Sequence, residues 1–219
     1  MTAHTAPKRA LIVIDAQNEY FTGGLPIEYP DPSLTIAHIG LAMDTAQAAG
    51  IPVIVVQQTS PASSPLFAVD SEGWQLHPVV ASRPHDHYLR KTLPSAYPET
   101  DLAAWLQARG IDTLTVIGYM THNCDASTIN HALHHGTAVE FLHDASGSVP
   151  YRNQAGYASA EDIHRVFSVV LQSRFAAVMS TQDWVDSVKT GAQPVRDNIY
   201  LSNRRARGLL QDAVTQQAA

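Results

Sequence analysis

Three side chains of the types that catalyse hydrolysis stand far apart in the sequence: Asp15, Lys91 and Cys124. A thiol can attack a carbonyl carbon, a carboxylate can accept the thiol proton, and an ammonium group can stabilise the negative charge. Each residue also has an ordinary structural interpretation. An aspartate can cap a turn, a lysine can lie on the surface, and a lone cysteine can serve as a small buried hydrophobic side chain. Residue type alone leaves both interpretations open.

The local sequence places each of the three near the beginning or end of an expected element. Asp15 ends a buried apolar run, where packing gives no reason for a carboxylate. Cys124 follows residues 118–123 at the expected beginning of a helix, where unpaired backbone N–H groups and the helix dipole stabilise a thiolate. Lys91 lies where a long irregular segment leads toward the next expected helix.

Short β-branched runs alternate with amphipathic stretches along the chain. Continuous apolar runs are typical of strands that are covered on both faces, and helical spacing of apolar residues predicts helices between them. The expected strands are 10–15, 52–57, 113–118, 138–143 and 175–179, and the expected helices are 35–49, 101–109, 123–135 and 160–173. Gly50, Gly110 and Gly136 each follow a helical run, as helix C-terminal glycines do, and Ser159 suits a helix N-cap.

This alternation predicts a three-layer α/β/α fold with a mostly parallel sheet of five or six strands. We expect a single domain over residues 1–191 and a polar C-terminal tail over residues 192–219. In open α/β sheets the ligand site lies beyond the carboxyl ends of the strands. The residues expected to gather there are Asp15, Gln57, Gln58, residues 118–124, His143 and Asp144. The long irregular segments 22–33 and 59–93 are expected to be binding loops or lids.

Composition excludes several classes of partner. The 219-residue chain has 14 Lys plus Arg against 20 Asp plus Glu, a formal charge of −6, so no positive field is available for nucleic acid. The basic cluster at 204–207 is expected to be solvated or in a subunit contact. Apolar runs fall far short of the ~18 residues of a membrane span, and the N-terminus resembles no signal peptide, which argues for the cytoplasm.

Metal binding and disulfides are also not expected. The single cysteine excludes an intramolecular disulfide and a Cys-x-x-Cys metal site. Two histidine pairs, His85 with His87 and His131 with His135, have spacings that a divalent ion accepts. No third ligand is evident for either pair. The sequence therefore predicts no metal and no cofactor.

Three segments carry a resemblance to a known family. They are 14–21 (IDAQNEYF), 91–97 (KTLPSAY) and 118–124 (GYMTHNC). In this order and separation they resemble the three signature blocks of the isochorismatase-like cysteine hydrolases, which include nicotinamidases and N-carbamoylsarcosine amidases. The resemblance extends from about residue 8 to residue 188, and it implies the isochorismatase-like hydrolase fold.

The resemblance also implies roles for individual residues. Asp15, Lys91 and Cys124 match the catalytic triad of the family. The Tyr119–Met120 peptide bond matches one that is typically cis in the family, and the backbone N–H groups of Met120 and Cys124 match its oxyanion hole. Nicotinamidases carry an Asp-x-His metal-binding stretch where this chain has residues 57–62 (QQTSPA), and this departure favours a metal-independent enzyme.

We therefore predict a cysteine hydrolase that cleaves a C–N bond of a small carboxamide or carbamoyl compound through a thioester, releasing ammonia or an amine. Two alternatives stay open. A vinyl-ether hydrolase of the isochorismatase type would use Asp15 as the acid and leave Cys124 dispensable. A noncatalytic member of the fold would bind a small molecule and form no covalent adduct.

The expected substrate-binding residues are less directly supported. Tyr20 stands where relatives place an aromatic residue that stacks on a ring. Gln57 or Gln58, at the end of the second expected strand, could hydrogen-bond a polar substrate. Trp74 either belongs to a lid or anchors its own loop, and Asn123 is either a helix N-cap or a substrate contact. Tyr119 is also expected to bind substrate.

The family resemblance makes a homo-oligomer, a dimer or a tetramer, the expected state. Apolar residues at 198–201 give an independent reason, because little core remains after residue 191 to cover them. We expect the segment from about 193 to 210 to contribute to the subunit contact.

Overall fold

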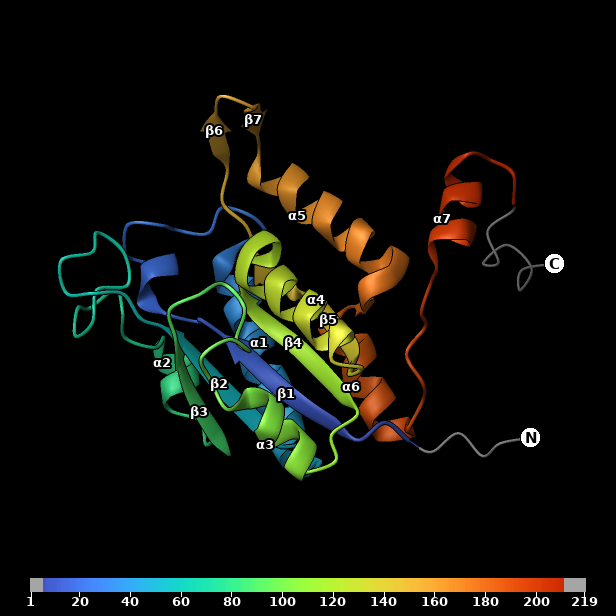
Figure 1. Ribbon diagram of the computed structural model, residues 1–219, viewed down its shortest axis with the longest axis horizontal. Helices are drawn as coiled ribbons and strands as arrows, with labels where there is room; N and C mark the ends of the chain where they lie inside the picture. Colours follow the sequence, from blue (N-terminus) through green and yellow to red (C-terminus); the bar gives the residue numbers. More distant parts are fainter. Residues whose placement is uncertain (1–5, 211–219) are drawn as a thin grey trace.

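The computed structural model describes residues 6–210 and contains a six-stranded sheet with helices on both faces (Figure 1). The strand order is β3-β2-β1-β4-β5-β8, and all neighbouring strands are parallel. The strands are β1 (Arg9–Ile14), β2 (Val53–Gln58), β3 (His87–Lys91), β4 (Thr113–Tyr119), β5 (Ala138–Gly147) and β8 (Ala177–Met179). The predicted three-layer α/β fold with a parallel sheet is confirmed.

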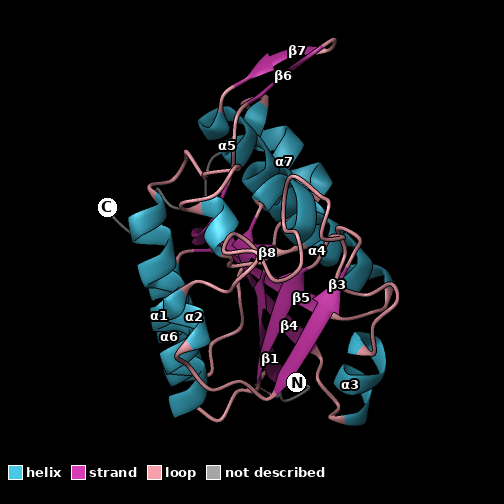
Figure 2. Cartoon of the chain, turned by 90° about the vertical axis from the view of Figure 1, so that its left-hand side faces the viewer, coloured by secondary structure: helices cyan, strands magenta, loops and turns pink. Residues whose placement is uncertain are grey.

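Helices cover the sheet as two outer layers. They are α1 (Pro32–Ala48), α2 (Pro78–Ala81), α3 (Leu102–Ala108), α4 (Ala126–His134), α5 (Ala160–Val170), α6 (Thr181–Thr190) and α7 (Ile199–Ala206). Shorter turns are η1 (Asn18–Tyr20), η2 (Thr121–Asp125) and η3 (Leu171–Phe175), the last two with the wide π-helical pitch. Figure 2 shows α1 and α6 on one side of the sheet and α3 and α4 on the other.

The central strand β1 explains why the expected strands are continuously apolar. Leu11 and Val13 pack into the core beneath α1 and α6, whereas Ile12 and Ile14 pack into the core beneath α3 and α4. Successive side chains of a strand point to opposite faces, so a strand covered on both sides is apolar at every position.

Local signals at the helix ends are confirmed. Gly50, Gly110 and Gly136 have φ values of 67°, 60° and 81°, the left-handed conformation that ends a helix. The side chain of Ser159 accepts a hydrogen bond from the N–H of Asp162 and caps α5.

Several elements differ from the sequence-based expectation. The segment 59–93, expected to be irregular throughout, contains α2 and the edge strand β3. Because β3 lies at the edge of the sheet, only Leu89 and Lys91 of this strand are buried, and no apolar run marks it. The expected helix 123–135 consists of η2 followed by α4. A hairpin of β6 (Tyr151–Asn153) and β7 (Gly156–Ala158) projects from one end of the molecule (Figure 1).

The C-terminal segment is not uniformly irregular. It contains α7, which no sequence signal predicted, and the remainder of the expected tail, residues 211–219, lies outside the described residues. Within residues 6–210 no helix is long and apolar enough to cross a membrane.

Candidate active site

The structure brings Asp15, Lys91 and Cys124 together at the carboxyl end of the sheet. Asp15 directly follows β1, Lys91 is the last residue of β3, and Cys124 lies in η2, just beyond β4. The Lys91 ammonium Nζ lies 2.6 Å from Asp15 Oδ2 and donates a hydrogen bond to Cys124 Sγ at 3.2 Å. One ammonium group therefore contacts both the carboxylate and the thiol.

Burial sets the protonation states of these groups. The side chains of Asp15 and Lys91 are 0% exposed, and Cys124 is buried. Burial raises the pKa of Asp15, although the adjacent Lys91 opposes the shift. Burial and the nearby Asp15 raise the pKa of Cys124 well above its usual value, against the opposing effect of Lys91. Burial disfavours the charged form of Lys91, but Asp15 and Cys124 outweigh it and raise the pKa of the ammonium. The free site thus holds an ammonium ion and a protonated thiol.

The backbone around Asp15 depends on a glycine in the neighbouring strand. Asp15 has a φ of 52°, in the left-handed region that aspartate tolerates better than most residues. Gly118 of β4 has a φ of 120°, and a Cβ atom there would lie 2.0 Å from the carbonyl oxygen of Ile14. Only glycine therefore lets β4 approach β1 directly beside the carboxylate.

The turn that carries Cys124 is fixed by polar contacts behind it. The Tyr119–Met120 peptide bond is cis, and the Met120 carbonyl accepts hydrogen bonds from the N–H groups of Asn123 and Asp125 at 3.0 and 3.2 Å. The Asp125 carboxylate accepts a hydrogen bond from Ser146 Oγ at 2.6 Å, and burial raises the pKa of Asp125 to about 7. These contacts hold η2 against β5.

A second set of contacts extends this network. The Thr121 hydroxyl lies 2.7 Å from Ser146 Oγ and 2.8 Å from His164 Nδ1. Burial lowers the pKa of His164 to about 4, so its imidazole is neutral near pH 7. Sequence reasoning missed Thr121, Asp125, Ser146 and His164 as supports of the turn that carries Cys124, because isolated polar residues in buried segments carry no periodic signal.

A cavity of about 350 Å³ opens onto Cys124. Of the residues expected to bind substrate, Tyr20, Gln58 and Asn123 line it, as does Met120. The Gln58 side-chain carbonyl also accepts a hydrogen bond from Lys91 Nζ at 2.7 Å, which connects the cavity wall to the ion pair.

Two other expected substrate-binding residues do not line this cavity. Trp74 anchors its own loop, since its indole N–H donates to Thr59 Oγ1 at 3.0 Å and its carbonyl accepts from Gln57 Nε2 at 2.6 Å. Tyr119 is fully buried, and its hydroxyl pairs with Thr35 Oγ1 at 2.6 Å. Neither residue is among those that line the cavity.

Several lining residues were not expected individually. Leu25, Leu66, Phe67 and Thr92 come from the two long connecting segments, which the sequence predicted to be binding loops or lids. Pro94 follows the second segment, and Tyr151 comes from the β6–β7 hairpin. Gln17 holds one of these loops in place. Its Nε2 donates to the carbonyls of Gln58 and Trp74 at 3.0 and 2.7 Å, and its Oε1 accepts from the Gln58 N–H at 2.9 Å.

The histidine pairs considered from the sequence have other partners. His131 and His135 stack on the ring of Tyr97, with centroid distances of 4.6 and 5.3 Å, and His87 Nε2 lies 2.8 Å from Asp101 Oδ1. In the part of the chain that the structure describes, no group of three or more His, Cys, Asp or Glu side chains could hold a metal ion.

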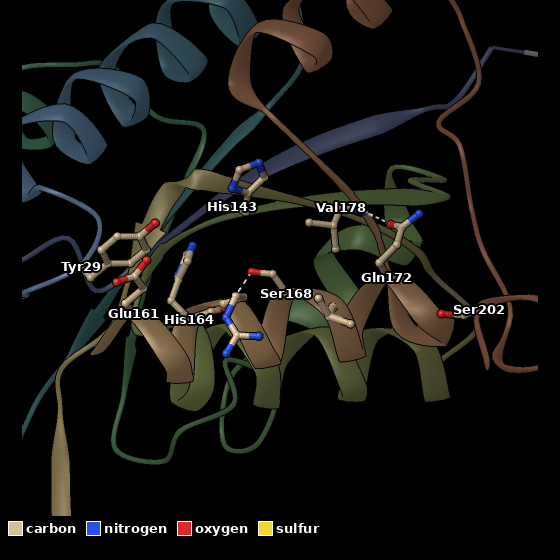
Figure 3. A pocket seen from close by; sticks show the side chains of 10 residues that line it. Tyr29, His143, Glu161, His164, Ser168, Gln172, Val178 and Ser202 are labelled. Carbon is tan, nitrogen blue, oxygen red and sulfur yellow. Dashed lines mark hydrogen bonds between the residues drawn. The ribbon is translucent and has the colours of Figure 1, made fainter. Parts of the chain in front are cut away.

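A second, larger cavity of about 460 Å³ lies apart from the triad (Figure 3). Figure 3 shows Glu161, His164 and Ser168 projecting from α5 toward this space, with His143 of β5 on the opposite side. None of the three triad residues lines it. The smaller cavity, which contains the thiol, is therefore the candidate active site.

Comparison with known proteins agrees with this geometry. The isochorismatase domain model matches residues 9–183. A crystal structure of a Burkholderia xenovorans LB400 protein assigned to the isochorismatases is 68% identical, covers 93% of this chain and 98% of its own, and superposes with a TM-score of 0.92. Streptothricin hydrolase of Streptomyces noursei is 30% identical over 84% of this chain and 63% of its own length. Nicotinamidase of Escherichia coli K12 is 27% identical over 68% of this chain and 87% of its own. The chain belongs to the isochorismatase family.

Proposed function

We propose that the protein is a cysteine hydrolase that cleaves a C–N bond of a small carboxamide or carbamoyl compound through a thioester and releases ammonia or an amine. The observation that supports this proposal most directly is the position of the Lys91 ammonium. It contacts the Asp15 carboxylate at 2.6 Å and the Cys124 thiol at 3.2 Å. The similarity to streptothricin hydrolase and nicotinamidase supports hydrolysis as the reaction class.

The first step forms the thioester. Asp15 accepts the proton of Cys124, and the sulfur attacks the carbonyl carbon of the substrate, so that an S–C bond forms and the carbonyl electrons move to oxygen. The raised pKa of Asp15 makes this carboxylate a stronger base than an exposed one. The backbone N–H groups of Met120 and Cys124 are proposed to donate hydrogen bonds to the oxyanion.

The second step releases ammonia or an amine, and hydrolysis of the thioester then restores the thiol. Protonated Asp15 donates its proton to the nitrogen as the C–N bond breaks, which releases ammonia or an amine and leaves the thioester. The same carboxylate then accepts a proton from water, whose oxygen attacks the thioester carbon. The acid leaves and Cys124 recovers a proton, so one carboxylate serves both halves of the reaction.

Substrate binding is proposed to use the side chains that share the cavity with Cys124. Tyr20 offers a ring on which the substrate can pack, and the amide groups of Gln58 and Asn123 offer hydrogen bonds. No metal or cofactor takes part in the proposed reaction.

Measurement of ammonia release across a panel of primary amides, ureides and carbamoyl compounds tests the proposal. The substitution Cys124→Ala separates it from the alternatives. Loss of amide hydrolysis supports the thioester reaction, whereas a variant that still cleaves a vinyl ether shows that Asp15 acts alone as an acid. No turnover and no covalent adduct with any amide would indicate a binding protein.

We also propose that the protein acts in the cytoplasm as a homo-oligomer, a dimer or a tetramer. α5 presents Val166, Val169 and Val170, which are 47%, 61% and 47% exposed. Next to it, α7 exposes Ile199 and Tyr200, and none of the α7 residues is buried. A subunit contact over α5 and residues 193–210 would cover these apolar side chains.

A further inference from the structure

The cavity over Cys124 has no charged side chain in its wall. Within residues 6–210 its apolar lining consists of Tyr20, Leu25, Leu66, Phe67, Pro94 and Met120. The polar lining groups are the amides of Gln58 and Asn123 and the hydroxyls of Thr92 and Tyr151, all of them neutral. A charged group on a substrate would therefore enter this space without a counter-ion in the wall.

The Lys91 ammonium at the site already has three neighbouring partners. Its Nζ donates hydrogen bonds to Gln58 Oε1 at 2.7 Å and Cys124 Sγ at 3.2 Å, and it forms an ion pair with Asp15 Oδ2 at 2.6 Å. Asp15 balances the positive charge of Lys91, so a substrate carboxylate would meet no net positive field here.

The charged side chains of Glu19 and Arg90 make contacts with other parts of the chain. The Glu19 carboxylate accepts hydrogen bonds from the N–H groups of Gly24 and Phe67 and so fastens two connecting segments together. The Arg90 guanidinium lies over the ring of Trp74, 4.9 Å from the centroid, on a side chain that does not line the cavity. Neither side chain lines the cavity.

His122, which supports the hairpin side of the cavity, is neutral as well. Its Nε2 lies 3.0 Å from the hydroxyl of Tyr151 and its Nδ1 lies 3.1 Å from Ser148 Oγ. Burial lowers the pKa of His122 to about 4, so it carries no positive charge near pH 7. Its hydrogen bonds position the Tyr151 hydroxyl at the cavity.

We propose that the substrate is a small uncharged amide whose non-reacting part is apolar, and that the cavity discriminates against amides bearing a carboxylate or an ammonium group. Moving such a charge from water into a neutral, mostly apolar space is unfavourable when no opposite charge meets it. The volume of about 350 Å³ is near the lower end of the ~300–1,000 Å³ range of small-molecule pockets, which limits the size of that apolar part. The inference rests on the proposed amide hydrolysis.

Three amides of nearly equal size test the charge preference of the enzyme: butyramide, succinamate and 3-aminopropanamide. We expect kcat/KM for butyramide to exceed that for either charged amide by at least ~100-fold, a discrimination that an unpaired buried charge readily supplies. Equal rates, or faster hydrolysis of a charged amide, would overturn the charge preference and leave the proposed function standing. Hydrolysis of none of the three, nor of any other amide, would overturn the proposed function.

A second measurement does not depend on turnover. Iodoacetamide and iodoacetate both alkylate a thiol, with formation of an S–C bond, departure of iodide and loss of the thiol proton. Cys124 is the only cysteine, so intact mass reports its alkylation alone. Relative to the ratio measured for glutathione, we expect iodoacetamide to be favoured by at least ~10-fold. A ratio that favours iodoacetate would show that the cavity accepts an anionic reagent and would overturn the inference.

A pair of variants tests whether the side chains of the cavity wall cause the preference for uncharged reagents. Leu66 is partly buried and lines the cavity, so Leu66→Lys places an ammonium group there and Leu66→Met is the matched neutral control. We expect Leu66→Lys to move both ratios toward the anionic reagent, with Leu66→Met close to the wild type. Equal ratios in a folded Leu66→Lys protein would contradict a wall-based preference, and the wild-type ratios remain decisive if that variant does not fold.

Discussion

Replacing Lys91 with methionine removes the ammonium group and keeps a side chain of similar length. Asp15 is then left without its partner, and its side chain is 0% exposed. Breaking a buried ion pair by removing one member destabilises a protein by about 3–5 kcal/mol, because the remaining charge is buried and uncompensated. Near pH 8 we expect the free energy of unfolding of Lys91→Met to fall by about that amount.

The loss depends on pH in a direction that the structure fixes. Burial already raises the pKa of Asp15, and removal of Lys91 takes away the largest opposing effect. A carboxyl group whose pKa is raised by folding stabilises the folded state fully below its unfolded pKa, about 4, and loses that contribution as pH rises through the folded value. The difference between Lys91→Met and the wild type should therefore be small near pH 4 and grow toward pH 8.

Urea denaturation followed by tryptophan fluorescence between pH 4 and pH 8 measures this difference. The double variant Asp15→Asn/Lys91→Met is the matched control, because it removes both charges. We expect the double variant to be more stable than Lys91→Met at pH 8, and both to be inactive. A stability loss in Lys91→Met that is the same at every pH, or a double variant that is no more stable, would refute the reasoning.

Four further expectations follow from other features. Cys124→Ala should reduce kcat/KM for amide hydrolysis by at least ~1,000-fold, and retention of activity would exclude the thioester. Gly118→Ala, whose Cβ would lie 2.0 Å from the Ile14 carbonyl, should cost about 3 kcal/mol or more in urea denaturation, whereas Gly136→Ala, with open space around it, should cost about 1 kcal/mol. Burial raises the pKa of Asp125 to about 7, so the carboxyl's stabilisation is complete below about pH 4 and is lost as pH rises through 7; Asp125→Asn should therefore gain stability relative to the wild type over that interval in urea titrations. Light scattering should show an oligomer for the full chain and a smaller assembly after truncation at Gly191; a monomeric full chain, or an oligomer unchanged by truncation, would contradict the subunit contact.

The sequence predicted the centre of the sheet better than its edge. β1 and β4 are buried on both faces. The apolar run 10–14 in β1 and the apolar residues Leu114, Val116 and Ile117 in β4 reflect this burial. The edge strand β3 carries the exposed Arg90 between the buried Leu89 and Lys91, and such a strand has no continuous apolar run. The position of Lys91 beside Cys124 therefore followed only from the family resemblance, since no strand had been predicted to carry it.

Cavity walls were predicted still less completely. The rule that ligands bind beyond the carboxyl ends of parallel strands located Asp15, Gln58 and Cys124, which follow from strand positions alone. Loop residues such as Leu66 and hairpin residues such as Tyr151 reach the cavity through tertiary contacts, and no spacing in the sequence records those contacts. The same limit applies to Trp74, whose carbonyl accepts hydrogen bonds from Gln17 and Gln57 and which does not line the cavity.

The ion pair gives a physical reason why the proposed reaction, which proceeds through charged groups, is compatible with a buried, neutral cavity. Transfer of the Cys124 proton to Asp15 replaces a carboxylate with a thiolate, and the Lys91 ammonium contacts both positions, at 2.6 and 3.2 Å. The negative charge therefore moves by a few ångströms beside one fixed positive charge, and the net charge of the site does not change. An additional charge carried by a substrate would have no such compensation. In the proposed reaction, the arrangement that supports the proton transfer is thus the same one that would favour an uncharged substrate.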